Sequence, residues 1–390
     1  MLSTRPSDCF KLNIFFWKIF GIWPGRKYTK FYKYVSATYL LITWIIYNFL
    51  LTLNLFYSPR KIDLIIREAT FYFNEVAITA QVLMILKMRV EIFEIFEYLD
   101  CNTFEGNDDI SKSYIKKAID QYNFCHRLYL IFCHFAYVAL AVFPVIRYWI
   151  TSGPLELPIS KYYFLTDEHR DNYFIYWYIY QSLGIYGHMT YDINIDSFIV
   201  GLMLMAITQL KVINYQLSNM KLNSIEATGT KDVQETIFIS KLKQNLRHYE
   251  LVLKYCARVT DVIRVTMFVQ FSMSSAVICA VLYGLLLPSS MENIIFMVVY
   301  LGAMTTEIFV PGWLGTQLSY ESGLLVSSAY NIDWLPRSQS FKRSLKLFIV
   351  RANIPIKLHL YMFHLNLESF LAIMKTAYSC FSLLRNVQSR

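Results

Sequence analysis

Seven long apolar stretches constrain this chain more than any other feature of its sequence. A backbone crossing a bilayer must satisfy its hydrogen bonds internally, and about twenty consecutive apolar residues do so as a spanning helix. The composition agrees, because 55% of the 390 residues are hydrophobic and 17% are charged, whereas soluble domains carry about 25% charged residues. We therefore predict an all-α membrane protein with seven transmembrane helices, at 34–56, 69–86, 128–146, 173–210, 265–287, 293–314 and 358–384.

The basic residues are sorted between the two sides of the predicted membrane. Of the 37 lysines and arginines, 28 lie in the N-terminal segment and in the connections on its side, and 8 lie on the opposite side. The positive-inside rule then predicts a cytosolic N-terminus and an extracellular C-terminus, in the plasma membrane. The formal charge of +9 is explained by this sorting, so we expect membrane lipid and no nucleic acid as a partner. The orientation and the absence of Asp-Arg-Tyr and Asn-Pro-x-x-Tyr motifs argue against a G-protein-coupled receptor.

The predicted organisation has four parts. Residues 1–33 form a cytosolic segment with an interfacial amphipathic helix, and we expect no cleavable secretory signal there. Residues 34–335 hold the first six spans, an outer pocket and cytosolic helical extensions. Residues 336–355 form a cytosolic helix whose apolar stripe is Phe341, Leu345, Phe348 and Ala352, and residues 356–390 form the last transmembrane helix. The cytosolic helices are expected to pack on one another as an anchor platform that also contacts other subunits.

Three further local expectations follow from the sequence. The first span, which has no internal charge, is expected to face lipid. Pro144 predicts a kink in the third span. The outer connection 151–172 is either a lid over a vestibule or a plain connector.

No catalytic constellation is present in the sequence. It has no glycine-rich phosphate loop, no GxSxG elbow and no HExxH motif, so we expect no enzyme, no cofactor and no metal. An inverted seven-span zinc hydrolase would share the orientation but needs several intramembrane histidines at one depth. Only His134 and His188 lie well inside spans, which leaves that class as a remote alternative.

The last stretch is apolar, yet polar residues recur along it at steps of seven, four, three and four. Such spacing places them in one stripe of a helix. A stripe of this kind must be hidden from lipid. It is either satisfied by neighbouring helices or lines a water-filled pore. The residues are Glu368, Lys375, Ser379, Ser382 and Asn386.

Three blocks of the sequence resemble the insect odorant receptor family. They are the ending from Asn366 to Ser379, the stretch from Pro311 to Trp334, and the segment from Ser344 to Ile356. The chain departs from the family pattern at Gly312, where cysteine is common, and at Cys380, where an aromatic residue is common. The related gustatory receptors end in a Thr-Tyr and a later Gln-Phe that this chain lacks, and they remain the nearer alternative.

The resemblance implies an odorant-gated, non-selective cation channel in which the last helix of each of four subunits surrounds a central pore. The short stretch 218–231 resembles a ligand-specific tuning subunit, which works in a heterotetramer with the family's shared co-receptor. By the same resemblance, Leu383 and Val387 form a hydrophobic gate, with Ser379 and Asn386 along the path beside it. Such constrictions block ions by dewetting.

The resemblance also implies a pocket for a small volatile odorant in the outer half of each subunit, and olfaction in a sensory dendrite. Glu75 is as well explained by a structural hydrogen bond between helices as by a role in ligand binding. Asp192 and Asp196 are expected to hold helices together. For each candidate, ordinary packing is the alternative role. The candidates by depth and spacing are Phe71, Tyr72, Glu75, Phe143, Ile146, Tyr176, Tyr180, Gln181, Gly184, Met297 and Tyr300.

Overall fold

The computed structural model describes residues 5–23, 29–106, 108–151, 155–221, 230–288 and 291–388. Helices dominate this part of the chain, and the one sheet found in it pairs two short strands. Among the described residues, six helices are long and apolar enough to cross a membrane. The 22 residues of α14 (Leu367–Gln388) form a further helix of spanning length. The predicted all-α membrane fold is confirmed, while its orientation stays a prediction.

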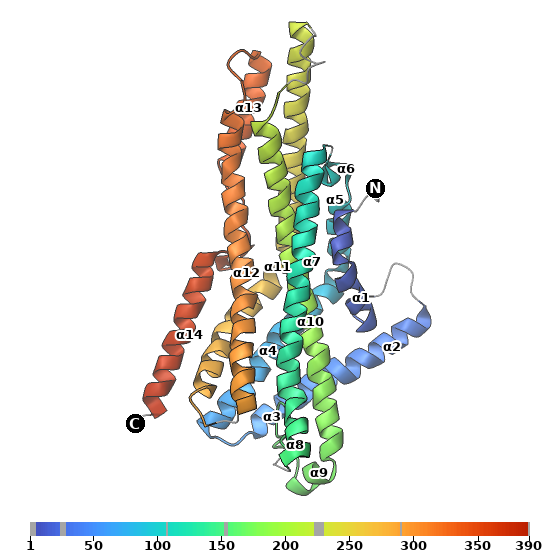
Figure 1. The fold of residues 1–390 in the computed structure, drawn as a ribbon, viewed down its shortest axis with the longest axis vertical. Helices are drawn as coiled ribbons and strands as arrows, with labels where there is room; N and C mark the ends of the chain where they lie inside the picture. The colour runs from blue at the N-terminus through green and yellow to red at the C-terminus, as the bar shows by residue number, and fades with distance from the viewer. Residues whose placement is uncertain are drawn as a thin grey trace.

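Four long helices run along the long axis of the molecule (Figure 1). They are α7 (Asp109–Ala141), α10 (Phe174–Ser218), α11 (Lys231–Gly284) and α12 (Met291–Tyr330). α10 is the central one: it contacts the other three and α4 (Ile62–Lys87), and most of its residues are buried. A helix that is apolar on all sides is expected in such a position. α11 joins the predicted cytosolic helix and the predicted fifth span into one continuous helix of 54 residues.

The first span is largely exposed, as the expectation of a lipid-facing helix requires, but one of its faces packs on protein. It runs through α2 (Lys30–Leu40), a π-helical stretch η2 (Leu41–Ile46) and α3 (Tyr47–Tyr57). Tyr47, Leu51 and Asn54 are buried, whereas Ile45 and Phe49 are exposed. Residues four and three apart share a helix face, so this span has one face packed on protein and does not simply face lipid.

Two helix boundaries follow from local chemistry. α7 ends at Ala141 and α8 (Phe143–Thr151) begins two residues later, so the break predicted at Pro144 is confirmed. The connection after α8 contains a short helix, α9 (Asp167–Asn172), which begins where the Thr166 side chain accepts a hydrogen bond from the His169 backbone. The segment 151–172, predicted to be either a lid or a connector, includes residues 152–154, which lie outside the described part.

The N-terminal end has η1 (Pro6–Phe10) and α1 (Lys11–Ile19), where the sequence predicts an amphipathic helix. Phe10 and Trp17 are buried with their ring centroids 5.1 and 5.0 Å from that of Phe198 in α10. Phe15 and Ile19 are exposed. One apolar side of α1 therefore packs on protein, and the exposed side is free to meet a membrane surface.

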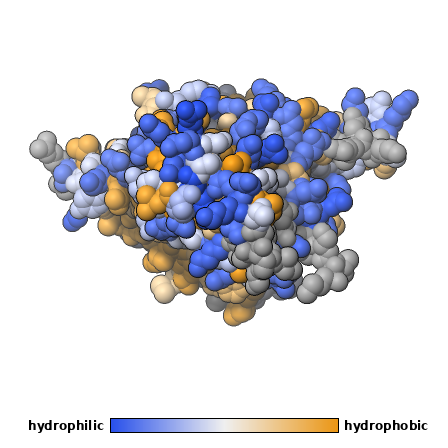
Figure 2. All heavy atoms as spheres, turned by 90° about the horizontal axis from the view of Figure 1, so that it is seen from above, coloured by the Kyte–Doolittle hydropathy of each residue, from blue (hydrophilic) through white to orange (hydrophobic). Residues whose placement is uncertain are grey.

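A cap of helices covers one end of the bundle. α13 (Gln339–Ala352) lies there with the beginning of α11, while α5 (Arg89–Leu99) and α6 (Asn102–Glu105) lie lower, beside the beginning of α7 (Figure 1). The α13 stripe predicted from the sequence is buried, with Phe341 beside Phe238 and Phe348 beside Tyr249 of α11. Figure 2 shows that this end is mostly hydrophilic, as expected for a part that stands in water.

The segment before α14 corrects the predicted start of the last span. Residues predicted to be helical from 358 form an antiparallel hairpin, β1 (His359–Leu360) with β2 (Phe363–His364), and the helix begins at Leu367. The reason is a period of two: Ile356, Leu358 and Leu360 are buried and the residues between them are exposed. Alternation of this kind is typical of a strand. The apolar character predicted for this segment is confirmed, but the helical period predicted for its first residues is wrong.

Candidate functional site

Two adjoining cavities lie between the helices at the end of the molecule that carries α8 and α9. The larger, called the loop-side cavity, has a volume of about 460 Å³ and is lined by α4, α8, α11, α12 and residues 156–159. The smaller, called the deep cavity, has a volume of about 80 Å³ and lies among α3, α4, α7, α10 and α12. Concave, mostly apolar spaces between helices are typical of small-molecule sites.

Three stacked aromatic rings form a wall between these cavities. The Phe296 ring lies 6.1 Å from that of Phe71 and 5.4 Å from that of Tyr300, measured between centroids. Each of the three residues lines both cavities. The hydroxyl of Tyr300 is buried and has no hydrogen-bond partner among the described residues. A ligand that turns these rings would join the two spaces, and the hydroxyl offers it a polar contact.

The deep cavity carries one buried ionisable pair. The Nδ1 atom of His188 contacts the Glu75 carboxylate, and its Nε2 atom lies 2.7 Å from the backbone oxygen of Thr43. Both ring nitrogens therefore face oxygen atoms, and these two contacts fix the orientation of the ring. The pair joins α4 to α10 and fixes the polar part of the cavity wall.

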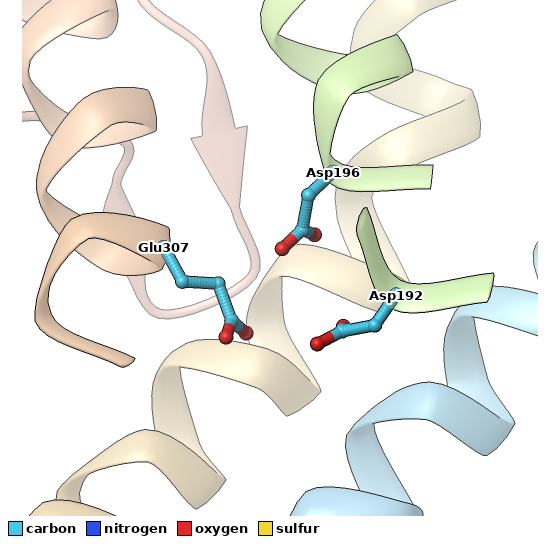
Figure 3. Close-up of side chains that lie close together, drawn as sticks. All are labelled: Asp192, Asp196 and Glu307. Atoms are coloured by element: carbon cyan, nitrogen blue, oxygen red, sulfur yellow. The ribbon is translucent and has the colours of Figure 1, made fainter. Parts of the chain in front are cut away.

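Beyond the deep cavity lies a cluster of three buried acids. Asp192 and Asp196 of α10 and Glu307 of α12 turn their carboxyl groups toward one another (Figure 3), and one oxygen of each lies within 4.8 Å of the others. The Gln81 amide donates to Asp196 over 2.8 Å, and the Gln270 amide donates to Asp196 over 3.0 Å and also to Glu307. Through these amides the cluster ties α4 and α11 to α10 and α12.

α14 lies along the outside of the bundle against α11 and α12 (Figure 1). Ala377 is buried in that contact, while Ser379, Leu383 and Asn386 are exposed, with Leu383 exposed by 66%. The spacing of four and three residues places these three on one face. Val387 lies in α14, but its side chain is outside the described part.

The sequence matches the family described as 7tm Odorant receptor over residues 61–378. That is most of the chain. The chain belongs to the 7tm odorant receptor family.

Individual receptors show the same likeness. Odorant receptor 10 of Aedes albopictus is 24% identical over 62% of this chain and 63% of its own length, and odorant receptor 67c of Drosophila melanogaster is 25% identical over 58% and 54%. The chain thus spans between about half and two thirds of these relatives. Odorant receptor 30a of Drosophila melanogaster is 21% identical over 95% of this chain and 96% of its own. Membership of a receptor family supports the expectation that the chain is no enzyme.

A solved structure shows the same fold. The insect olfactory receptor OR5 from Machilis hrabei, in complex with eugenol, superposes with a TM-score of 0.81 at 18% identity, covering 97% of both chains. The expected likeness to insect odorant receptors is therefore confirmed for the family and for the fold, and the chain is a multi-pass membrane protein.

The structure brings some of the candidate pocket residues of this odorant receptor together. Phe71, Glu75, Met297 and Tyr300 line the loop-side or the deep cavity. Phe143 packs on the same apolar cluster as Phe71 and Met297.

Other candidates do not line these two cavities. Ile146 and Tyr176 are exposed by 47% and 72%, and Tyr180 donates a hydrogen bond to the backbone of Ile42. Gln181 is buried and holds the loop beside the cavity, by accepting from the backbone of Ile159 and donating to that of Ser160. Tyr72 also stays outside both linings.

Sequence reasoning missed several residues of the site. Tyr47 lines the deep cavity and lies against Gly184, and its signal was the spacing of Tyr47, Leu51 and Asn54. Phe296 completes the aromatic wall. Glu307 was an acid within an otherwise apolar span, a pattern that marks functional candidates in membranes.

Proposed function

We propose that this odorant receptor is the ligand-specific subunit of an odorant-gated, non-selective cation channel. The observation that carries the proposal is an apolar cavity inside the helices, combined with a helix of spanning length whose polar stripe is exposed. The cavity offers a binding site within one chain, and the stripe offers a wall for water and ions when several chains meet.

The ligand is proposed to be a small, mostly apolar volatile that has one polar group. The deep cavity is lined mainly by apolar and aromatic side chains. Its polar groups include the Glu75–His188 pair, Asn74, Asp192 and the Tyr300 hydroxyl. A pocket with a few fixed polar groups selects ligands by orientation as well as by shape. The similar receptor from Machilis hrabei was solved in complex with eugenol, which supports a ligand of this size class.

The channel is proposed to be a heterotetramer with the co-receptor, in the plasma membrane, with the N-terminus in the cytosol. Two observations support this arrangement. Basic residues gather at the capped end, where α13 carries Lys342, Arg343 and Lys346. The exposed apolar residues of α14, including Leu371 and Leu383, need a partner surface or lipid. Ligand binding would shift a closed–open equilibrium by favouring the open state.

The experiment is current recording from cells that express this chain with and without a co-receptor, during application of a panel of volatiles. We expect a direct current that needs both chains. Signals that require G proteins and carry no direct current would reject the channel.

The ligand site is tested in the same cells with Tyr300→Phe, which removes only the unpartnered hydroxyl. Loss of one hydrogen bond predicts a roughly 2- to 10-fold higher half-maximal concentration for an active volatile with a polar group. Tyr176→Phe is the matched control, because Tyr176 is exposed outside the cavities. Equal shifts in both variants would contradict the proposed pocket.

A further inference from the structure

The three-acid cluster of Asp192, Asp196 and Glu307 is explained neither by a volatile ligand nor by a pore along α14. Its members are exposed by only 7%, 7% and 5%, within helices that cross the membrane. Three carboxylates so close together repel one another and lose most of their hydration. They need a compensating positive charge or protons.

Basic side chains do not supply that charge. The deep cavity and the groove on the other side of the cluster are lined by no lysine or arginine among the described residues. The imidazole of His188 is engaged by Glu75. Two neutral amides, from Gln81 and Gln270, are the groups that reach the carboxylates.

Unpartnered oxygens at the cluster are the second, independent observation. Gln81 and Gln270 are fully buried, and within the part of the chain that the structure describes the amide oxygen of each has no hydrogen-bond partner. One oxygen each of Asp192, Asp196 and Glu307 is unpartnered as well. Buried polar atoms usually have partners. In the structure the amide nitrogens face the carboxylates. Half a turn of the amide leaves its shape unchanged and brings the oxygen to that side instead, as an ion ligand requires.

The spacing of the acids fits one hard cation. Oxygen ligands of Ca²⁺ lie about 2.3–2.6 Å from the ion, so ligands on opposite sides are up to about 5 Å apart. The ligand oxygens of the three acids lie within 4.8 Å of one another. Mg²⁺ requires shorter bonds and retains several waters, and Zn²⁺ prefers nitrogen and sulfur ligands. Three carboxylates and two amides supply eight oxygens, enough for the six to eight that Ca²⁺ takes.

Two spaces adjoin the cluster. Asp192 lines the deep cavity, whereas Asp196 and Glu307 line a lateral groove of about 600 Å³ between α7, α10 and α12. The cluster therefore separates the deep cavity from this groove.

We propose that Asp192, Asp196 and Glu307, with the amide oxygens of Gln81 and Gln270, bind a single Ca²⁺ ion within the helix bundle. The bound ion neutralises the cluster and holds α4, α10, α11 and α12 together. The site stands on these contacts alone and is independent of whether the chain forms a channel.

The test measures thermal unfolding of the purified full-length chain in lipid nanodiscs, with EGTA, with Ca²⁺ and with Mg²⁺. A ligand that binds only the folded state raises Tm as its concentration rises. We expect Ca²⁺ to raise Tm and Mg²⁺ at the same concentration to have a smaller effect. In the double variant Asp196→Asn with Glu307→Gln, the Ca²⁺-dependent rise should be lost. Its Tm in EGTA should not fall, because the substitutions relieve repulsion between buried charges.

The matched control is Glu250→Gln with Asp261→Asn. These acids form exposed ion pairs with Lys254 and Arg264 on α11, so the Ca²⁺-dependent rise should be retained. Gln270→Met is the second variant, because it keeps all three acids and removes one oxygen ligand. Equilibrium binding of radioactive Ca²⁺ should then show an affinity at least about tenfold weaker.

Three results would overturn the proposal. The first is a wild-type Tm that does not respond to Ca²⁺ and changes only with pH, which would mean that protons neutralise the cluster. The second is an equal response to Mg²⁺. The third is an unchanged Ca²⁺ affinity in Gln270→Met or in the double variant.

Discussion

Gly184 sets the position of Tyr47 in the wall of the deep cavity. A Cβ atom at residue 184 would overlap the Tyr47 ring, so the close approach of α10 to α3 depends on the missing side chain. Gly184→Ala should move the ring and lower the free energy of unfolding by about 1–3 kcal/mol, the usual cost of overpacking. Thermal unfolding measures this change.

Gly323→Ala is the matched control for this prediction. Gly323 also lies inside a long helix, α12, and a Cβ there would meet nothing within 4 Å. Alanine should stabilise the helix at that position by up to about 1 kcal/mol. Similar losses in both variants would show that helical glycine as such, rather than contact with Tyr47, sets the stability.

Asp108 predicts a pH dependence at the beginning of α7. Its side chain accepts hydrogen bonds from the Ser111 backbone over 3.0 Å and from Gln216 over 3.2 Å. Burial raises the pKa of the Asp108 carboxyl, but these hydrogen bonds lower it, and the net pKa lies below its ordinary value. A carboxyl group whose pKa is lower in the folded than in the unfolded state stabilises the fold at any pH above its ordinary pKa. This stabilisation is lost as the pH falls through the pKa of the folded state.

Asp108→Ala should therefore cost about 1 kcal/mol of helix capping at neutral pH. The difference in Tm from the wild type should shrink as the medium is acidified below the ordinary pKa of aspartate. Asp108→Asn keeps an oxygen that caps the helix, so it should retain most of the stability and lose the pH dependence. If the Tm difference between Asp108→Ala and the wild type did not change with pH, the negative charge of Asp108 would not contribute to the stability of α7.

At the scale of elements, the approach of α12 to the segment that precedes α14 depends on Gly315. A Cβ at residue 315 would overlap the backbone oxygen of Leu365, which cannot turn aside as a side chain can. Gly315→Ala should displace the start of α14 and lower Tm. Gly302→Ala is the control, because its Cβ would lie 3.5 Å from Phe132, an ordinary contact. Equal Tm values for the two variants would show that α12 and the segment before α14 can move apart without loss of stability.

The same elements show what the sequence could predict. The α13 stripe and the break at Pro144 follow from period and local geometry, so they were found. The hairpin at His359–His364 was missed because the short alternating run Ile356–Leu360 lies inside a long apolar stretch that is also typical of a spanning helix. Residues that meet only through tertiary packing were harder still, such as Glu307 of α12 beside Asp196 of α10.

At the scale of the whole molecule, α14 is the element that a single chain leaves incomplete. Its inner side packs on α11 and α12, but Tyr378 and Leu383 are each exposed by 66%. Exposed apolar side chains next to a polar stripe suit a helix that meets other subunits on one side and water on another.

The last prediction concerns the gate in the assembled channel. If Leu383 narrows the pore together with Val387, the double variant Leu383→Ala with Val387→Ala widens and rewets the constriction. We expect a larger resting current, without odorant, in cells that also express the co-receptor. Leu371→Ala makes the same change nearer the start of α14, where the side chain is also exposed, and should leave the resting current unchanged. A double variant with normal resting current and normal gating would place the barrier to ions elsewhere along the helix.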